Sequence, residues 1–333
     1  MNTTRIAVLG AGSWGTALAI ALARRPGNRV VLWGRDAAQI TAIRESRENV
    51  GFLPGVPLPE AIHPSADLAE AADAEAILMV TPSRGVRETA TRLAAIGTRA
   101  TLISCTKGIE HGSSLRMSEI LAEILPGNPV AVLSGPSHAE EVARGMPTAL
   151  VLGCAQEALA ARWQAAITTP AFRIYTSTDV PGIELGGALK NVFAIAAGLG
   201  DGLGFGDNSK AALVTRALGE LIRVGMAMGG RSETFHGLSG VGDLMVTCFS
   251  RHSRNRRVGE ELGRGGRTLE AIMESMTMVA EGVPTTLAAW ECARHHGLST
   301  PVIDAVYALL YLQKTPQEIL EETLTRTPRS EIG

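Results

Sequence analysis

The chain has 333 residues, of which 45% are hydrophobic, 19% charged and 4% aromatic, and its formal net charge is −2. This length suits two domains of ordinary size, and the composition is that of a compact globular protein and not of a disordered one. The small net charge provides no bulk field for nucleic acid or an acidic membrane, so an anionic ligand would be bound by local cations.

The first half of the chain alternates short apolar runs with segments of helical period. Buried strands are predicted at residues 5–9, 29–33, 76–80, 101–104, 130–134, 149–152 and 172–176. Helices are predicted at residues 36–46, 86–95 and 115–125, which are polar and rich in Ala and Glu. This alternation predicts a doubly wound, mainly parallel sheet of the α/β class.

A glycine-rich turn lies between the first predicted strand and the helix after it. Gly10, Gly12 and Gly15 form a GxGxxG string, and its place in a βαβ unit makes it typical of a Rossmann-type dinucleotide site. Gly10 would allow the tight turn, Gly12 the approach of a pyrophosphate, and Gly15 the close packing of helix on strand. The amides of Ser13 and Trp14 would face the phosphates at the positive end of the helix dipole.

The same uncharged stretch, residues 6–23, also fits a signal peptide, because Arg5 precedes it and Arg24 follows it. Its glycines would interrupt an apolar helix, so the strand, turn and helix start are favoured. No other run approaches the roughly 20 apolar residues that cross a bilayer, and no membrane span is expected.

Arg35 and Asp36, which follow the second predicted strand, bear on the choice of cofactor. Arg35 would pair with the 2′-phosphate of NADP(H), which favours that cofactor. Asp36 keeps NAD(H) possible, since an acidic residue in this region binds a ribose 2′-hydroxyl. A solvated loop cation is the alternative interpretation of Arg35.

From residue 179 onward the pattern becomes helical, and no strand-like run of comparable quality follows. Leu185, Leu189 and Val192 share one face of a helix with Phe193 and Ala196. Further helices are predicted at residues 211–228, 268–278, 285–295 and 303–312, with a break between helices at 198–206. The simplest division is a dinucleotide-binding domain at 1–178 and an all-α substrate and catalytic domain at 179–333.

Two lysines have the chemistry of a hydride-transfer site, which needs a proton donor with a pKa near working pH. Lys107 lies just beyond the carboxyl end of a predicted strand, the edge at which open α/β sheets bind ligands. Lys190 lies within an otherwise apolar helix, where burial and a nearby cation such as Lys107 would lower its pKa. The alternative is a lysine that extends its ammonium from the helix edge into water.

A third segment, residues 237–257, combines glycines with clustered arginines and predicts an anion site. Arg254 would bind phosphate oxygens, and Ser253 and Asn255 would supply neutral hydrogen bonds. Asp243 would hold a lysine ammonium or a substrate hydroxyl. A nucleic-acid patch is disfavoured because aromatic residues and a basic balance are missing, and a solvated basic face is the remaining alternative.

The cysteines and histidines indicate no metal centre. Cys105, Cys154, Cys248 and Cys292 contain no CxxC pair and are expected to be reduced thiols of a cytoplasmic protein. The seven histidines show no HExxH string or clustered ligand spacing.

Eight strings in chain order, between Arg5 and about Leu312, resemble the NAD(P)-dependent glycerol-3-phosphate dehydrogenases of bacteria. They are GAGSWGTALA, NVGFLPG, CTKGIE, SGPSHAEEV, ALKNVFAIAAG, GLSGVGDLMVTC, HSRNRRVG and VAEGV. Departures from the family pattern are mild: Phe52 stands where tyrosine is common, and Ser239 where alanine is common. The resemblance implies reduction of dihydroxyacetone phosphate to sn-glycerol 3-phosphate for phospholipid synthesis, and a homodimer.

The resemblance also implies roles for individual residues. Lys190 would donate and accept the proton, and Lys107 would touch both cofactor and substrate. The substrate site would include both lysines with Gly135, Ser137, Asp243, Ser253, Arg254 and Asn255. The cofactor side would include the glycine loop with Ser13, Trp14, Arg35, Lys107, Ala139, Arg254, Val279 and Glu281. Asn191 and Thr247 would be supporting polar residues.

Two other functions remain open. A related two-domain dehydrogenase, such as a phosphogluconate or ketopantoate enzyme, shares the expected architecture, but those families lack the GLSGVGDLMVTC and HSRNRRVG strings. A non-catalytic cofactor-sensing module would be expected to lose the lysine or the anion site, and this sequence keeps both.

Overall fold

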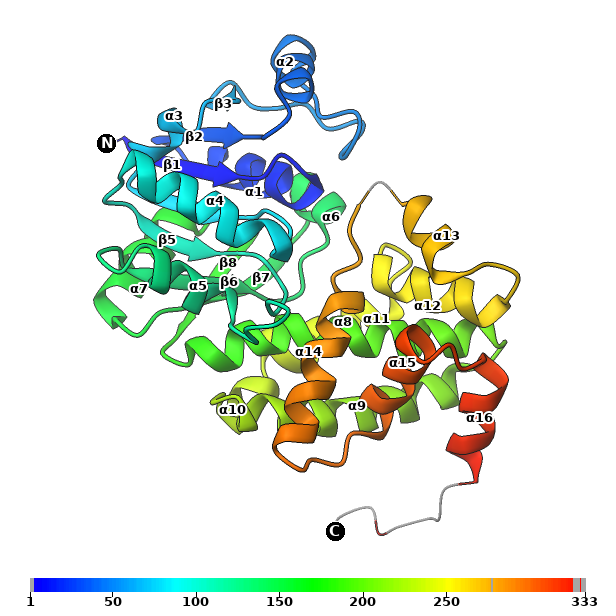
Figure 1. Cartoon of the computed structure of the whole chain (residues 1–333). Helices are drawn as coiled ribbons and strands as arrows, with labels where there is room; N and C mark the ends of the chain where they lie inside the picture. The colour runs from blue at the N-terminus through cyan, green and yellow to red at the C-terminus, as the bar shows by residue number, and fades with distance from the viewer. Residues whose placement is uncertain (1–2, 277, 326–329, 331–333) are drawn as a thin grey trace.

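The strands form one eight-stranded sheet in the order β3-β2-β1-β4-β5-β6-β7-β8. Figure 1 shows the strands in the part of the molecule that carries the N-terminus, with the helices of the second half of the chain beside and below them. The computed structural model, which describes residues 3–276, 278–325 and 330, contains strands β1 Thr4–Leu9, β2 Asn28–Trp33, β3 Ile62–Ser65, β4 Ala76–Met79, β5 Thr101–Ser104, β6 Val130–Ser134, β7 Thr148–Gly153 and β8 Phe172–Ser177. Neighbouring strands are parallel except that β6 and β7 are antiparallel. The predicted mainly parallel sheet is confirmed.

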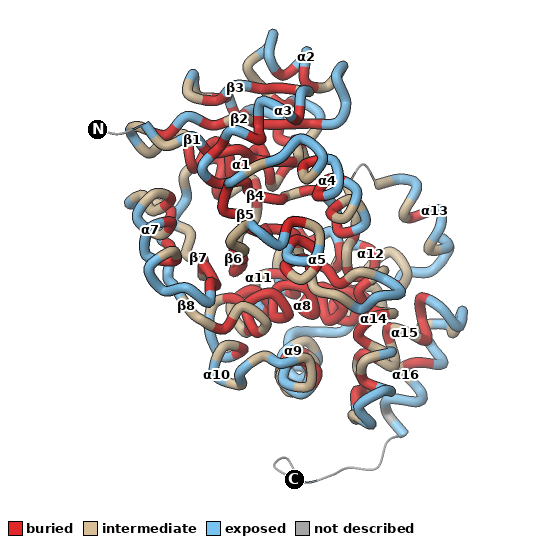
Figure 2. Tube along the Cα trace, turned by 60° about the vertical axis from the view of Figure 1, so that its left-hand side comes forward, coloured by how far each residue is buried: buried red, intermediate tan, exposed pale blue. Residues whose placement is uncertain are grey.

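Helices cover both faces of the sheet. They are α1 Ser13–Ala23, α2 Ala37–Ser46, α3 Ala69–Ala72, α4 Ser83–Ile96, α5 Met117–Ile124, α6 Ala139–Ala143 and α7 Glu157–Ile167. Because side chains alternate along a strand, Val8 of β1 packs in a core with Leu18 of α1, while Leu9 packs on the opposite face with Val86 of α4. Both cores appear as buried segments in Figure 2. The order of strands reverses at β1, between β2 and β4, and this switch point is where such sheets bind ligands.

All seven predicted strands are present, and β3 is an eighth that the sequence pattern did not reveal. Its four residues include His63 and Pro64, which break the apolar run that predicts a strand. Proline is tolerated there because β3 lies at the edge of the sheet, where its missing N–H leaves no inner ladder unpaired.

The second half of the chain is helical, as predicted, and surrounds one central helix. Its elements are α8 Val180–Gly202, α9 Asp207–Ala227, α10 Ser232–Phe235, a π-helical turn Leu238–Gly242, α11 Asp243–Phe249, α12 Arg254–Arg264, α13 Leu269–Glu274, α14 Gly282–His295, α15 Pro301–Tyr311 and α16 Pro316–Leu324. By length and composition α8 is apolar enough to cross a membrane, contrary to our expectation that no such run exists. Its apolar window is wholly buried inside the protein, as the core helix of a globular domain is.

The predicted break at 198–206 is wrong in position, because α8 continues through Gly202. Its glycines serve helix packing instead. A Cβ added at Gly198 would lie 1.8 Å from the carbonyl oxygen of Arg256, and one added at Gly259 would lie 1.9 Å from that of Ile195. The backbones of α8 and α12 therefore touch directly, and the chain turns only at Gly204, which has a φ of +81°.

Helix α13 is shorter than the predicted helix at 268–278. It begins after Thr268, whose side chain accepts a hydrogen bond from the Ala271 amide, and it ends at Glu274. The predicted segment also includes Thr277, which lies outside the described residues.

Candidate active site

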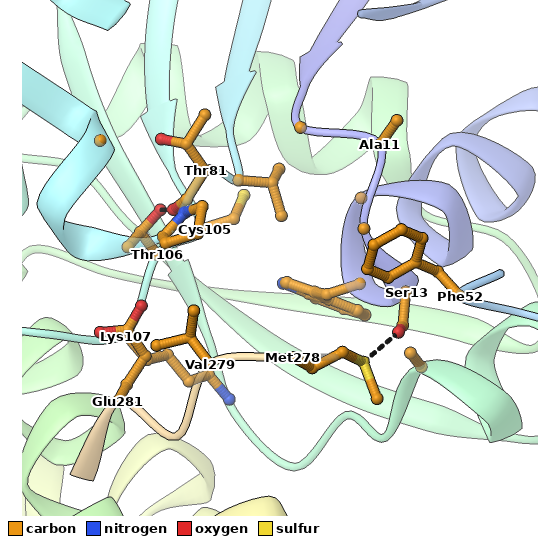
Figure 3. Close-up of a pocket in the computed structure, with 18 of the residues that line it drawn as sticks. Ala11, Ser13, Phe52, Thr81, Cys105, Thr106, Lys107, Met278, Val279 and Glu281 are labelled. Atoms are coloured by element: carbon orange, nitrogen blue, oxygen red, sulfur yellow. Dashed lines mark hydrogen bonds between the residues drawn. The ribbon is translucent and has the colours of Figure 1, made fainter. Parts of the chain in front are cut away.

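One cleft of about 660 Å³ lies between the carboxyl ends of the strands and the helical half of the chain. Figure 3 shows the glycine-loop residues Ala11 and Ser13 on one side of it and Lys107 and Glu281 on another. All the predicted cofactor residues line this cleft, as do the predicted substrate residues except Gly135 and Asp243. The structure thus gathers segments that are far apart in the sequence.

The geometry of the glycine loop fits a dinucleotide pyrophosphate. Gly10 has a φ of +129°, in the region that favours glycine, and a Cβ on Gly15 would lie 1.8 Å from the carbonyl oxygen of Gly10. A Cβ on Gly12 would meet no atom within 4 Å, so this part of the backbone is open to an incoming group. The indole nitrogen of Trp14 is buried and has no partner among the described residues.

A segment of the helical half reaches across the cleft to this loop. The Ser13 hydroxyl donates a hydrogen bond to the Met278 sulfur at 2.8 Å (Figure 3). Val279, which follows Met278, also lines the cleft. The approach to the glycine loop is therefore bounded by both halves of the chain.

Two residues after Val279 in this segment, Glu281 joins the two halves by hydrogen bonds. Its carboxylate accepts one from the Ser83 amide at 2.9 Å and one from the Ser83 hydroxyl at 2.5 Å, at the first residue of α4. A carboxylate here is favoured by the positive end of the helix dipole. Glu281 thus fixes the helical half against α4 besides facing the cleft.

Arg35 and Asp36 lie together at the end of the cleft beside β2, but their side chains have different surroundings. Arg35 is exposed and makes no salt bridge with any described residue. One oxygen of Asp36 accepts hydrogen bonds from the amides of Ala38 at 2.9 Å and Gln39 at 3.2 Å, so the carboxylate caps α2.

At the other end of the cleft, Asp243 binds both predicted lysines. Lys107 donates to Oδ2 of Asp243 at 2.6 Å and also to the Gly135 carbonyl oxygen at 3.0 Å. Lys190 donates to Oδ1 of Asp243 and to the Thr247 hydroxyl at 2.6 Å. Asp243 has no exposed surface, so of the two predicted roles the structure supports the one of holding ammonium groups.

The site changes the protonation of Lys190. This lysine is only 6% exposed, which excludes a side chain extended into water. Burial is the largest influence and lowers the pKa of Lys190 to about 7, with Lys107 acting in the same direction and Asp243 opposing it. An ammonium with such a pKa can release and recover a proton near neutral pH.

Gly135 and Ser137 support this end of the cleft. Gly135 has a φ of +139°, and a Cβ there would lie 2.9 Å from Leu150, so its backbone conformation needs glycine. Its carbonyl oxygen accepts hydrogen bonds from Lys107 and, at 2.9 Å, from the Ser137 hydroxyl. Gly135 therefore positions Lys107 without itself lining the cleft, whereas Ser137 does line it.

In the predicted anion segment, Arg254 lines the cleft without a polar partner among the described residues. It is exposed and forms no salt bridge with any described residue. The Ser253 hydroxyl accepts from the Arg256 amide at 3.2 Å and caps α12. Asn255 donates to Asn191 at 2.9 Å and accepts from the Gly282 amide at 2.8 Å. Ser253 and Asn255 each retain one donor hydrogen for a ligand.

The cleft also contains residues that the sequence did not single out. Ala139 was predicted, but its neighbour His138 was not, and neither were three charged residues of α4: Arg84, Glu88 and Arg92. Their spacing of four residues places them on one helix face, which was the available signal, although such a face is usually solvated. Among the described residues no cluster of three or more His, Cys, Asp or Glu could hold a metal ion.

A dinucleotide cradle at the switch point of the sheet, with a buried lysine of lowered pKa across the same cleft, defines the class of two-domain Rossmann-type dehydrogenases. Models of the N-terminus and C-terminus of NAD-dependent glycerol-3-phosphate dehydrogenase match residues 5–160 and 179–321. The chain belongs to this NAD(P)-dependent family.

Similar proteins cover almost the whole chain. It is 46% identical over 329 residues to the glycerol-3-phosphate dehydrogenase (NAD(P)+) of Desulfitobacterium hafniense, covering 98% of this chain and 93% of that protein. It is 47% identical over 335 residues to a second one from Salinibacter ruber, covering 99% and 96%. The crystal structure of glycerol-3-phosphate dehydrogenase from Coxiella burnetii has a TM-score of 0.92 at 37% identity, covering 97% and 99%. A ketopantoate reductase from Ralstonia eutropha, at 17% identity and TM-score 0.63 over 95% and 100% of the chains, shares the fold alone.

Proposed function

We propose that this chain interconverts dihydroxyacetone phosphate and sn-glycerol 3-phosphate by hydride transfer with a nicotinamide dinucleotide. The observation that carries the proposal is the arrangement of Lys190, buried with a pKa of about 7, and the unpartnered Arg254 in one cleft with the glycine loop. Family membership supports the same reaction.

Each residue has a distinct task in the proposed reaction. The glycine loop with Ser13 and Trp14 would hold a nicotinamide dinucleotide, which in its reduced form would supply the hydride for the carbonyl carbon of the substrate. Lys190 gives a proton to the oxygen as negative charge develops there, and takes it back in the reverse direction. Asp243 holds the Lys190 and Lys107 ammonium groups in place, and Lys107 adds positive charge beside the reacting oxygen. Arg254 binds the phosphate, with the free donors of Ser253 and Asn255 beside it.

We further propose that NADP(H) is preferred and NAD(H) is possible. Arg35 offers a guanidinium free of any ion pair within the described residues, whereas the carboxylate of Asp36 is occupied in capping α2. A 2′-phosphate would gain a charged hydrogen bond at Arg35, while a ribose 2′-hydroxyl would compete for Asp36 with the α2 amides.

The wider setting is also a proposal. We propose the boundary between the two domains at residues 178 and 179, and the end of β8 at Ser177 and the start of α8 at Val180 support it. The enzyme is proposed to be a cytoplasmic homodimer, with a phosphorylated small molecule as its substrate and without nucleic-acid partners. Its product would supply phospholipid synthesis.

The decisive test is Lys190→Ala, with Lys314→Ala as the control because Lys314 pairs with Glu322 outside the cleft. Initial rates with dihydroxyacetone phosphate would be followed by nicotinamide absorbance, and cofactor binding by calorimetry. We expect Lys190→Ala to lower turnover by at least about 100-fold while cofactor binding persists. Near-normal turnover would reject the assigned role, and no oxidation of either reduced cofactor by the wild type would favour another substrate.

A further inference from the structure

Helix α4 contributes a second cation to the end of the cleft where Arg35 lies. Arg92, on the second half of this helix, lines the cleft together with Trp33, Gly34 and Arg35. Its guanidinium carbon lies 5.6 Å from the centroid of the Trp33 ring. Because Trp33 ends β2 and is followed by Gly34 and Arg35, the two arginines reach the same region from different elements.

The position of Arg92 is set by a rigid support. Trp33 is 2% exposed, and its indole nitrogen donates to the Ala66 carbonyl oxygen at 3.1 Å, so the ring is fixed. A guanidinium within about 6 Å of an indole face is attracted by the ring, which restricts where the side chain lies. Arg92 thus loses less side-chain freedom on binding an anion than an unsupported surface arginine would.

The charges of this end of the cleft favour an anion. Neither Arg35 nor Arg92 makes a salt bridge with any described residue, whereas Arg87 on the same helix pairs with both Glu110 and Glu123. Two carboxylates are nearby: Asp36, which caps α2, and Glu88, one turn before Arg92. Two guanidinium groups without ion-pair partners lie near one carboxylate that caps a helix and one that is exposed. The positive charge of the two arginines can therefore bind a dianionic ligand.

We propose that Arg92 is a specificity-determining residue that binds the 2′-phosphate of NADP(H) together with Arg35. The inference rests on the proposed use of NADP(H) and extends it by a residue from a separate element. Because NAD(H) has a hydroxyl in place of this phosphate, removal of Arg92 weakens the binding of one cofactor and spares the other.

Calorimetry with adenosine 2′,5′-bisphosphate and adenosine 5′-monophosphate tests this directly, without any need for turnover. The variants are Arg92→Gln and Arg35→Gln, with Arg162→Gln as the matched control. Arg162 lies 4.9 Å from the centroid of the Trp163 ring and pairs with Glu75, and it does not line the cleft. We expect Arg92→Gln to weaken binding of the bisphosphate by about tenfold and of the monophosphate by less than about twofold.

A charge series guards against a local loss of structure. Arg92→Lys keeps the charge but lacks the guanidinium fork, so its affinity for the bisphosphate should lie between those of the wild type and Arg92→Gln. Arg92→Glu should weaken binding of the bisphosphate further. The ratio of kcat/KM for NADPH to that for NADH should fall in the same order.

The outcomes separate this inference from the NADP(H) proposal. If the wild type prefers the bisphosphate and only Arg35→Gln abolishes the preference, the role of Arg92 is overturned and the choice of NADP(H) stands. Equal binding of both nucleotides by the wild type would overturn both. Equal weakening of both nucleotides by Arg92→Gln would make Arg92 a general adenosine contact and would also reject its role in specificity.

Discussion

Lys190 donates a hydrogen bond to one carboxylate oxygen of Asp243, a residue with no exposed surface, across the contact between α8 and α11. The other oxygen of Asp243 receives the Lys107 ammonium. One buried anion therefore balances two cations, and the proton affinity of Lys190 depends on it. Substitution of Asp243 should therefore affect turnover and its pH dependence as substitution of Lys190 does.

Asp243→Asn should lower turnover by about 100-fold or more, because two ammonium groups would face each other without an anion. With the opposing influence of Asp243 gone, the pKa of Lys190 should fall further, so the rate of ketone reduction should decline at a lower pH than in the wild type. Initial rates across pH measure this, with the exposed Asp73→Asn as control. An unchanged pH profile would contradict the coupling.

The wild-type pH profile should report the Lys190 pKa of about 7. Reduction of the ketone needs the protonated amine, so its kcat/KM should fall as pH rises through that value. Oxidation of the alcohol needs the free amine and should fall as pH drops through it. Both directions should be followed between about pH 5 and pH 9 by nicotinamide absorbance; a flat profile in both would contradict the assignment.

Glu281 and Ser83 should act as a unit. Ser83→Ala and Glu281→Gln each remove part of the contact between α4 and the helical half, so each should raise the KM for the cofactor several-fold. The free-energy cost of the double variant in cofactor binding should be less than the sum of the costs of the two single variants. The difference, measured in a double-mutant cycle, should be a coupling energy of about 1 kcal/mol. Strict additivity would show that the two residues act separately.

Gly198→Ala should destabilise the protein by about 2 kcal/mol or more, because its Cβ would lie 1.8 Å from the Arg256 carbonyl oxygen. Gly200→Ala in the same helix is the matched control: its Cβ would have Phe205 at 3.6 Å as its nearest neighbour. That change should be neutral or stabilise by up to about 1 kcal/mol. Free energies of unfolding in urea compare them, and similar losses would disprove the backbone contact.

Glu220 should give stability a pH dependence of its own. Burial raises the pKa of this carboxyl to about 7, although the amides of Val302 and Ile303 donate to it. The folded protein then holds a proton that the unfolded chain has lost, so stability should fall as pH rises from about 4.5 to about 7, by up to about 3 kcal/mol. Urea unfolding across this range should show the slope, and Glu220→Gln should reduce it, whereas an unchanged slope in this variant would contradict the assignment.

Local patterns predicted the parts of the fold that local physics controls. Apolar runs predicted seven strands and the glycine string predicted the dinucleotide cradle. A buried strand selects apolar residues, and a tight turn selects glycine, within a few neighbouring positions. The strand at Ile62–Ser65 was missed because its edge position permits Pro64. The glycines of α8 were misread as a break because their partner, α12, lies more than 50 positions away.

The candidate site divides in the same way. The chemistry of Lys107 and Lys190 was readable from residue type and placement, but two roles were open for Asp243 until its burial was known. Capping by Asp36 is a local contact with amides two and three residues on, so an Asp before a predicted helix was the available signal. The cleft position of Arg92 depends on how α4 lies against β2. No pattern within α4 distinguishes a helix face that lines a cleft from one in water.

The direct contact of α8 and α12 backbones has one more consequence. Lys190 lies on α8, and Arg254 is the first residue of α12, so both are carried on two helices that no side chain separates. The spacing of the backbone positions that carry Lys190 and Arg254 is consequently set by main-chain packing and not by the side chains between the helices. We therefore expect longer or shorter phosphorylated ketones to be reduced more slowly than dihydroxyacetone phosphate, because either their oxygen or their phosphate would lie away from its residue.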